Sequence, residues 1–166
     1  MKKVFSFLSL LFIIIFGYGL YIFVKPEVNV PNFLIQRSVN KKFPMEKGYV
    51  VGKLKLTNPK VSLSGDKLII KVHYANDAVG DTIKGTMKFE TKVRYDYDNS
   101  ELYLDSFKLM EVTNDGNDVN MQKHPIIRTA LNSAFKTLEK DPVLDLKKYS
   151  FVEDIQIIDG KFILYK

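Results

Sequence analysis

Residues 124–140 carry the clearest helical pattern in this chain. On a helical wheel at about 100° per residue, their apolar side chains fall within a half-circle of about 180°. These side chains are Ile126, Ile127, Ala130, Leu131, Ala134, Phe135 and Leu138. A surface helix needs an apolar stripe of only about 100°, so the half-circle predicts a concave partner or contacts on two sides. Pro125 suits the first helical turn, and Asp141-Pro142 ends the helix.

Most of the chain before this helix alternates apolar and polar residues with a period of two, which predicts β-strands. The most regular segment runs from Thr82 to Tyr97 and contains sixteen residues. Most strands contain about 3–10 residues, and a strand of this length must twist. We therefore predict a long, curved antiparallel sheet that wraps around the helix, with Gly85 as a bending point.

Weaker patterns complete the predicted architecture. We expect a short N-terminal helix over residues 31–42, strands over 48–56 and 67–74, and a final hairpin over 151–166 that turns at Asp159-Gly160. The predicted fold class is therefore α+β, with one curved sheet, one long C-terminal amphipathic helix and one short helix.

A change of phase late in the predicted sheet indicates a β-bulge. Leu102 and Leu104 share one face of their strand, whereas Phe107 and Leu109 share the opposite face. One extra residue near Asp105-Ser106 would bring both pairs to the same face of the sheet. We therefore expect the bulge there and both pairs in the core.

The N-terminus predicts a membrane segment. Residues 4–24 are a run of 21 amino acids without charge. At about 1.5 Å of rise per residue, a helix of this length spans roughly 30 Å, the thickness of a bilayer core. Lys2 and Lys3 precede the run, and the positive-inside rule then places residues 25–166 outside the cytoplasm. We expect a single-pass anchor in a bacterial cytoplasmic (inner) membrane, with the domain facing the periplasm or the exterior.

A cleaved signal peptide is the alternative for the same segment. Residues 4–16 form a short apolar core, and Gly17-Tyr18-Gly19 offers small residues at a cleavage site. Leu20 to Val24 continue the apolar run, as an anchor would. Under both alternatives, residues 1–25 are an anchor or signal segment and residues 26–166 form a single exported domain, which is secreted or periplasmic after cleavage.

Composition and charge narrow the function classes. The chain contains no cysteine, which excludes disulfides, cysteine nucleophiles, thiolate metal ligands and lipid attachment to a cysteine. The net charge of +6 is spread along the chain, which argues against nucleic-acid binding. Lys84, Lys88, Lys92 and Arg94 share the polar face of the long strand, where they are either solvated or attracted to acidic lipid headgroups.

Candidate catalytic and metal-binding residues are few. His73 alternates with lysines on a polar strand face, and His124 precedes Pro125 at the helix start. The run Asn114–Asp118 lacks the ligand spacing and the terminal glutamate of a calcium loop. The chain has no nucleophile elbow, phosphate loop or dinucleotide fingerprint. We therefore predict no catalytic residue, no metal site and no cofactor.

Several segments of residues 28–166 resemble segments of one bacterial family. They are Val61–Leu63, Gly85–Phe89, Tyr95–Tyr97, Glu101–Asp105, Met110–Val112, Leu131–Phe135, Ile155–Ile157, Asp159-Gly160 and Phe162–Leu164. In this order they resemble the YceB-type bacterial envelope lipoproteins, whose fold is similar to the TULIP lipid-binding modules. The resemblance implies a curved sheet around a long helix, with room for an acyl chain between them. This chain has no cysteine to acylate, so a membrane segment at residues 4–24 would replace the lipid anchor.

We therefore predict a membrane-tethered envelope protein that binds a lipid, such as a fatty acid, between sheet and helix without catalysis. The predicted apolar lining consists of Met87, Phe89, Val93, Phe107, Leu109, Ile127, Leu131, Phe135 and Leu138. The alternative is a structural or protein-interaction module of the cell envelope with a solid core. The sequence indicates no nucleic-acid partner and identifies no protein partner.

Overall fold

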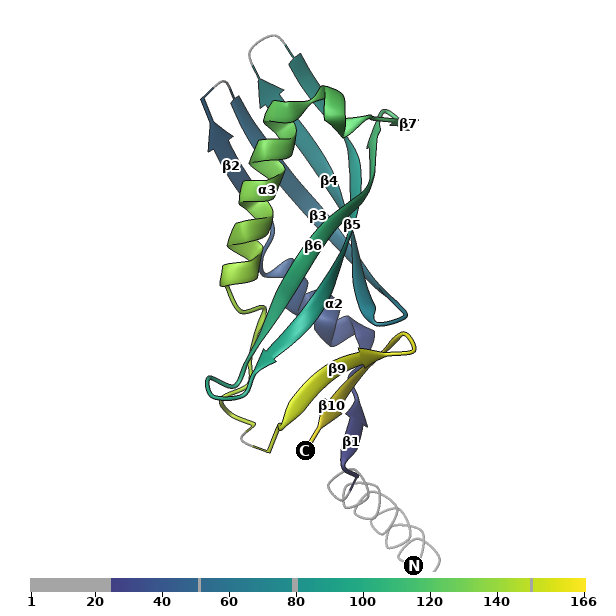
Figure 1. Ribbon diagram of the computed structural model, residues 1–166, viewed down its shortest axis with the longest axis vertical. Coiled ribbons are helices and arrows are strands. Elements are labelled where there is room, and N and C mark those ends of the chain that lie inside the picture. Colours follow the sequence, from purple (N-terminus) through teal and green to yellow (C-terminus); the bar gives the residue numbers. More distant parts are fainter. Residues whose placement is uncertain (1–24, 51, 79–80, 150) are drawn as a thin grey trace, which may run out of the picture.

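The computed structural model describes residues 25–50, 52–78, 81–149 and 151–166, and more than half of these residues lie in β-strands (Figure 1). In chain order the elements are β1 (Glu27–Asn29), α2 (Asn32–Asn40), β2 (Met45–Tyr49), β3 (Gly52–Ser64), β4 (Lys67–Ala78), β5 (Asp81–Asp96), β6 (Glu101–Asn114), β7 (Asn117–Asp118), the 3-10 helix η1 (Met121–Lys123), α3 (Pro125–Lys140), β8 (Leu144–Asp145), β9 (Asp154–Ile158) and β10 (Lys161–Tyr165). Long strands and short helices make the fold mainly β.

The strands form two antiparallel sheets. The large sheet has the order β2-β3-β4-β5-β6-β7, and β8 also pairs with β6. The small sheet has the order β1-β10-β9, so the first described strand pairs with the last one. The predicted final hairpin is therefore present as β9 and β10, but it belongs to a second sheet that the sequence analysis did not foresee.

The predicted fold class, α+β with one sheet wrapped around a long C-terminal helix, is wrong. The two α-helices contain nine and 16 residues, and three further strands follow α3. The apolar stripe of α3 is also narrower than predicted, because Ile126 is 52% exposed. The helix packs against β2, β3 and β6, so it rests on one face of the large sheet.

The physical reason is the different rise per residue of helices and strands. Both α3 and β5 contain 16 residues. An α-helix rises about 1.5 Å per residue and a strand about 3.3 Å, so α3 is about 24 Å long and β5 about 53 Å long. The helix covers only about half the length of the sheet. At the end that α3 does not reach, α2 and the small sheet lie against the large sheet (Figure 1).

Among the described residues, no helix combines the length and the apolar character that crossing a membrane requires. The predicted transmembrane segment, residues 4–24, lies outside the described part of the chain. The first described strand, β1, begins at Glu27, shortly after that segment in sequence.

The predicted β-bulge in β6 is confirmed. The pairing of β5 with β6 shifts register here: Glu90 pairs with Lys108, and Lys92 pairs with Asp105. Between these pairs β6 therefore has one residue more than β5. Ser106, between these two partners, takes a positive φ of 58°. As expected, the apolar pairs before and after the bulge are buried or pack against the core.

The strand predicted over residues 48–56 is instead a hairpin. β2 ends at Tyr49, β3 begins at Gly52, and the two strands pair antiparallel. Val50 lies in the turn, fully exposed. The prediction failed because the apolar–polar alternation continues on both sides of this short turn.

Gly85 marks a very close approach of β5 to β6. A β-carbon at this position would lie 1.8 Å from the carbonyl oxygen of Thr113, so any other residue would push the strands apart. The hydroxyls of Thr86 and Thr113 lie 3.0 Å apart beside it. Gly85 is therefore needed for close contact between the strands.

Backbone and side-chain hydrogen bonds hold the second layer over the end of the large sheet that α3 leaves open. α2 packs against β3, and β9 packs against β5. The amide of Val30 donates to the carbonyl of Phe162 (2.7 Å), which ties the entry of α2 to the small sheet. The hydroxyl of Tyr95 donates to the carbonyl of Val152 (3.2 Å), which ties β5 to the segment before β9.

Candidate functional site

The space between the large sheet, α2 and the small sheet is a cavity of about 950 Å³. Its apolar lining includes Leu68, Val93, Leu102 and Leu104 of the large sheet, Leu34, Ile35 and Val39 of α2, and Ile155, Phe162 and Leu164 of the small sheet. Pockets for small molecules have volumes of about 300–1,000 Å³ and mostly apolar walls. The cavity has both properties.

The segment that follows α3 closes one side of the cavity. The amide of Val143 donates to the carbonyl of Leu102, and the amide of Leu146 donates to the carbonyl of Ser100, both at 2.8 Å. β8 adds the pairing of Leu144 with Leu102. These bonds hold the segment against the edge of β6. As a result, Val143, Leu144 and Leu146 line the cavity.

Gln36 fixes the orientation of α2, which forms the opposite wall. Its side-chain amide donates to the carbonyl of Pro59 (2.7 Å) and accepts from the amide of Val61 (2.8 Å). Pro59 lies where the register of β3 against β4 shifts, between Thr57 and Lys60, and Val61 comes directly after this shift. The irregular strand leaves backbone groups that Gln36 satisfies, and the helix is held against β3 in return.

Three polar residues of the cavity lining, Arg37, Ser38 and Lys41, lie on α2 and at its C-terminal end. Ser38 is 9% exposed and lines the cavity, from which its hydroxyl stays accessible to solvent. Arg37 and Lys41 flank it on the same wall and are exposed. Across the described residues, neither cation takes part in an ion pair.

Most of the predicted lining lies beside this cavity, in the hydrophobic core beneath α3. Met87, Phe89, Ile127, Leu131, Phe135 and Leu138 are buried, and Phe107 and Leu109 pack against them. The ring centroid of Phe135 lies 5.1 Å from that of Phe89 and 4.9 Å from that of Phe107. Val93, the remaining predicted residue, lines the cavity itself. A ligand among the other predicted residues stays a prediction.

Sequence analysis missed the residues of α2 and the small sheet. The only local signal was in residues 31–42, where apolar positions without a clean stripe suggested a short helix of no particular role. Ser38 lies among these apolar positions, and in the structure it is on the buried side of the helix with Ile35 and Val39. A buried polar residue on an otherwise apolar face is the signal that could have indicated a site.

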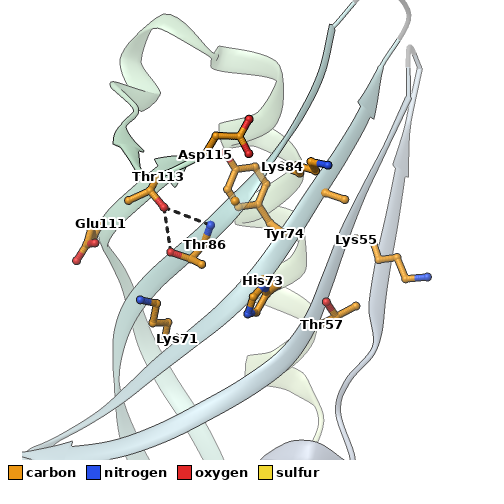
Figure 2. A pocket seen from close by; sticks show the side chains of 13 residues that line it. Lys55, Thr57, Lys71, His73, Tyr74, Lys84, Thr86, Glu111, Thr113 and Asp115 are labelled. Carbon is orange, nitrogen blue, oxygen red and sulfur yellow. Dashed lines mark hydrogen bonds between the residues drawn. The ribbon is translucent and has the colours of Figure 1, made fainter.

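A second hollow, of about 680 Å³, lies on the opposite, outer face of the large sheet (Figure 2). We call it the outer trough, and its lining includes Lys55, Thr57, Lys71, His73, Lys84, Thr86, Glu111 and Thr113. Figure 2 shows these side chains spread over neighbouring strands, with Thr86 hydrogen-bonded to Thr113. Because its lining is largely polar and charged, the trough suits a charged partner better than an acyl chain.

Three lysines lie side by side across β3, β4 and β5, and the middle one, Lys71, lines the outer trough. Lys60 is in register with Lys71, and Lys71 with Lys88. Side chains directly opposite each other are about 4.5–5.5 Å apart, and like charges there are destabilising. In the described ranges none of the three lysines forms an ion pair.

Two members of the predicted basic stripe have partners instead. The ammonium of Lys92 lies 3.6 Å from Asp66, and the guanidinium of Arg94 lies 4.6 Å from the ring centroid of Tyr103. Lys84 lines the outer trough. Near the trough, Glu111 lies opposite Lys88 on β6, so acidic residues accompany the stripe along β5.

Surface ion pairs shift several pKa values. A hydrogen bond from Lys67, at 2.8 Å, lowers the pKa of Glu90, and the same bond raises the pKa of Lys67. Hydrogen bonds from Tyr103 and Lys147 lower the pKa of Glu101. None of these residues lines the cavity or the outer trough, so the shifts reflect structural ion pairs.

No group of three or more His, Asp or Glu side chains is placed to hold a metal ion within the described residues. His73 lines the outer trough, and His124 precedes the first residue of α3.

A sequence model of the family described as "Protein of unknown function (DUF1439)" matches residues 32–156. The matched range runs from α2 through the large sheet and α3 into β9. No curated protein matches the chain. These comparisons support an uncharacterised domain family and do not extend to the YceB-type identity or the TULIP-like fold expected from the sequence.

Proposed function

Since the chain belongs to the DUF1439 family of proteins of unknown function, we propose a function from the geometry of the chain itself. The protein binds a lipid or another apolar ligand, without catalysis, in the cavity between the large sheet, α2 and the small sheet. The observation that carries this proposal is the size of the cavity, about 950 Å³, together with its apolar walls.

The physical argument is the transfer of an acyl chain out of water. Each buried methylene contributes about 0.8 kcal/mol, so a ten-carbon chain gains about 8 kcal/mol. Association costs about 4–15 kcal/mol in lost translational and rotational freedom. A useful affinity therefore needs a longer chain or an additional polar contact at its head.

We also propose that residues 4–24 tether this domain to a bacterial cytoplasmic membrane, with signal cleavage as the alternative. The uncharged run of 21 residues supports the tether. The kinship to YceB-type envelope proteins is likewise a proposal, supported by the segments quoted above. The mass of the protein purified from membranes distinguishes a retained anchor from a cleaved leader.

Filling the cavity tests the lipid-binding proposal. Val93→Trp places an indole in the cavity, and we expect it to abolish the lipid that co-purifies with the full chain, as measured by organic extraction and mass spectrometry. Ile126→Trp is the matched control, because that site on α3 is exposed and does not line the cavity. Equal lipid content in both variants and the wild type would contradict the proposal.

A second variant separates the cavity from the hydrophobic core beneath α3. Leu131 is 1% exposed beneath α3, so Leu131→Trp overpacks the core and lowers the free energy of unfolding by about 1–3 kcal/mol. Val93→Trp enters existing space and should cost less. If Leu131→Trp alone removed the lipid while remaining folded, the ligand would lie beneath α3, as the sequence analysis predicted.

The outer trough favours a second candidate function, docking of an acidic protein partner. The row of Lys60, Lys71 and Lys88 supports it, although Glu111 faces Lys88 from β6. Lys71→Glu places an opposite charge between the other two lysines, which should stabilise the fold by about 0.2–1 kcal/mol and remove the partner from pull-downs of envelope extracts. Unchanged pull-downs would exclude docking at this row.

A further inference from the structure

We propose that the cavity takes an anionic amphiphile and that α2 recognises its head group through Arg37, Ser38 and Lys41. This inference rests on the proposed lipid-binding function and names the ligand class, an acyl chain that ends in a carboxylate or a phosphate. The acyl chain lies among the apolar walls, and the anionic head lies along the α2 wall.

The first support is the hydroxyl of Ser38, which faces the cavity. The residue as a whole is 9% exposed, and the hydroxyl stays accessible to solvent from the cavity side. A hydroxyl that a protein presents to a mostly apolar cavity is one of the polar groups that can orient a ligand. A carboxylate or phosphate oxygen in the cavity would accept the hydrogen bond of Ser38.

The second support is the pair of cations next to Ser38. Arg37 and Lys41 lie four residues apart, so their side chains are neighbours on one side of the helix, and both line the cavity. Like charges at this spacing destabilise an isolated helix, and no described acidic residue forms an ion pair with either. The C-terminal end of the helix dipole favours cations and offsets part of this repulsion.

The third support is the charge balance of the whole lining. Its charged residues are Arg37, Lys41 and Lys166 on the positive side and Glu153 on the negative side. An anion therefore meets a net positive wall, whereas an uncharged head group would leave the α2 cations without compensation. Arginine also offers a planar fork that matches carboxylate and phosphate oxygens.

The cavity opens at an apolar rim next to the polar residues of the α2 wall. Leu34, Tyr149 and Phe151 are lining residues that remain 42%, 50% and 47% exposed. The rings of Tyr149 and Phe151 pack edge to face at 5.9 Å. One side of α2 presents, in order, Leu34, Arg37, Ser38 and Lys41. The cationic side chains therefore lie next to the apolar rim.

The test compares ligands that share a twelve-carbon chain and differ only in the head. Dodecanoate, dodecyl phosphate and dodecan-1-ol are titrated separately into the delipidated full chain at low salt, and each Kd is measured. We expect both anions to bind at least about tenfold more tightly than the alcohol. The preference should shrink as ionic strength rises, because Arg37 and Lys41 are exposed.

Variants assign that preference to α2. In the double variant Arg37→Gln/Lys41→Gln the anion-to-alcohol ratio should fall to near one, and Ser38→Ala should reduce it by a smaller factor. Lys140→Gln is the matched control, since Lys140 also lies in the last turn of a helix but does not line the cavity. It should keep the wild-type ratio.

Each outcome separates this inference from the proposed function. Equal binding of all three ligands would overturn the anionic head group and leave lipid binding in place. A preference that persists in the double variant would overturn the assignment to α2. Failure of every ligand, longer chains included, would overturn the proposed function as well.

The two anions also distinguish the sources of the head group. Tighter binding of dodecyl phosphate would indicate a phospholipid-type head, and tighter binding of dodecanoate a free fatty acid. Both results support the shared chemistry, a negatively charged oxygen cluster at the α2 wall.

Discussion

Ser38 makes a residue-scale prediction about stability. Its hydroxyl faces the cavity, where solvent reaches it in the ligand-free protein, so no full desolvation cost is present there. Ser38→Ala should therefore change the free energy of unfolding of ligand-free protein by about 0.5 kcal/mol or less in urea denaturation, through helix propensity.

The control for Ser38 is Ser133→Ala. Ser133 is exposed on α3, so its replacement changes helix propensity alone, by about 0.5 kcal/mol or less. We therefore expect equal effects in both variants. A gain of about 1 kcal/mol or more in Ser38→Ala alone would contradict this expectation, because it would show that the hydroxyl is an unsatisfied buried group.

Individual residues were partly predictable from the sequence. Alternation correctly placed Met87 and Phe89 inside and Lys84 outside, because burial on a strand has a strict period of two. The position of Ser38 in the cavity wall could not be predicted, because burial on a short helix depends on which neighbours pack against it. These neighbours range from β3, about twenty residues further along the chain, to the small sheet, more than a hundred residues away.

At the scale of elements, Gln36 links α2 to β3 and gives a second prediction. Gln36→Ala removes hydrogen bonds to Pro59 and Val61 and leaves a part-buried amide without its partner. The free energy of unfolding should fall by about 1–3 kcal/mol, and the amides of α2 should exchange with solvent faster than those of α3.

Gln156→Ala controls for the loss of a glutamine side chain. Gln156 donates to Asp154 at an exposed site on β9, so the stability change should stay within about 0.5 kcal/mol. Unchanged exchange of α2 in Gln36→Ala would show that apolar packing alone orients the helix.

The pattern of elements could be predicted better than their arrangement. The bulge near Ser106 and the hairpin at Asp159-Gly160 are local events with local signals, and both are present. The extent of sheet that α3 covers is not a local property. It depends on the lengths of the two elements, because a helix rises about 1.5 Å per residue and a strand about 3.3 Å. The pattern of apolar residues does not show this difference in length.

The whole molecule should lose stability in acid. The pKa values of Glu90 and Glu101 are lowered by hydrogen bonds from Lys67 and from Tyr103 and Lys147. A carboxyl whose folded pKa lies below its unfolded pKa contributes stability above the unfolded value, which is close to 4.5 for glutamate. That contribution is lost as pH falls through the folded pKa.

Urea midpoints measured from pH 7 to pH 3 check this expectation. The double variant Glu90→Gln/Glu101→Gln should show a smaller fall in acid than the wild type, and added salt should narrow the difference, because Lys67 and Lys147 are partly exposed. Parallel curves for the two proteins would show that other carboxyl groups control the acid transition.

The architecture of the whole molecule explains why the cavity escaped sequence analysis. β1 pairs with β10, so the ends of the described chain build one wall together, while residues near the middle of the chain build the floor. The sequence of each wall, taken alone, shows an ordinary apolar pattern. The space between the walls remains open because α3 is too short to cover the sheet, and no pattern within a single segment indicates this.

The most direct test of the central claim is to locate a bound lipid. A twelve-carbon fatty acid with a terminal diazirine is bound to the full chain, activated by light, and mapped by peptide mass spectrometry. The account predicts labels on residues that line the cavity, which are Leu68 and residues within 28–41, 93–104 and 143–166. Labels confined to residues 127–138 of α3 or to the outer trough, or no saturable label, would contradict it.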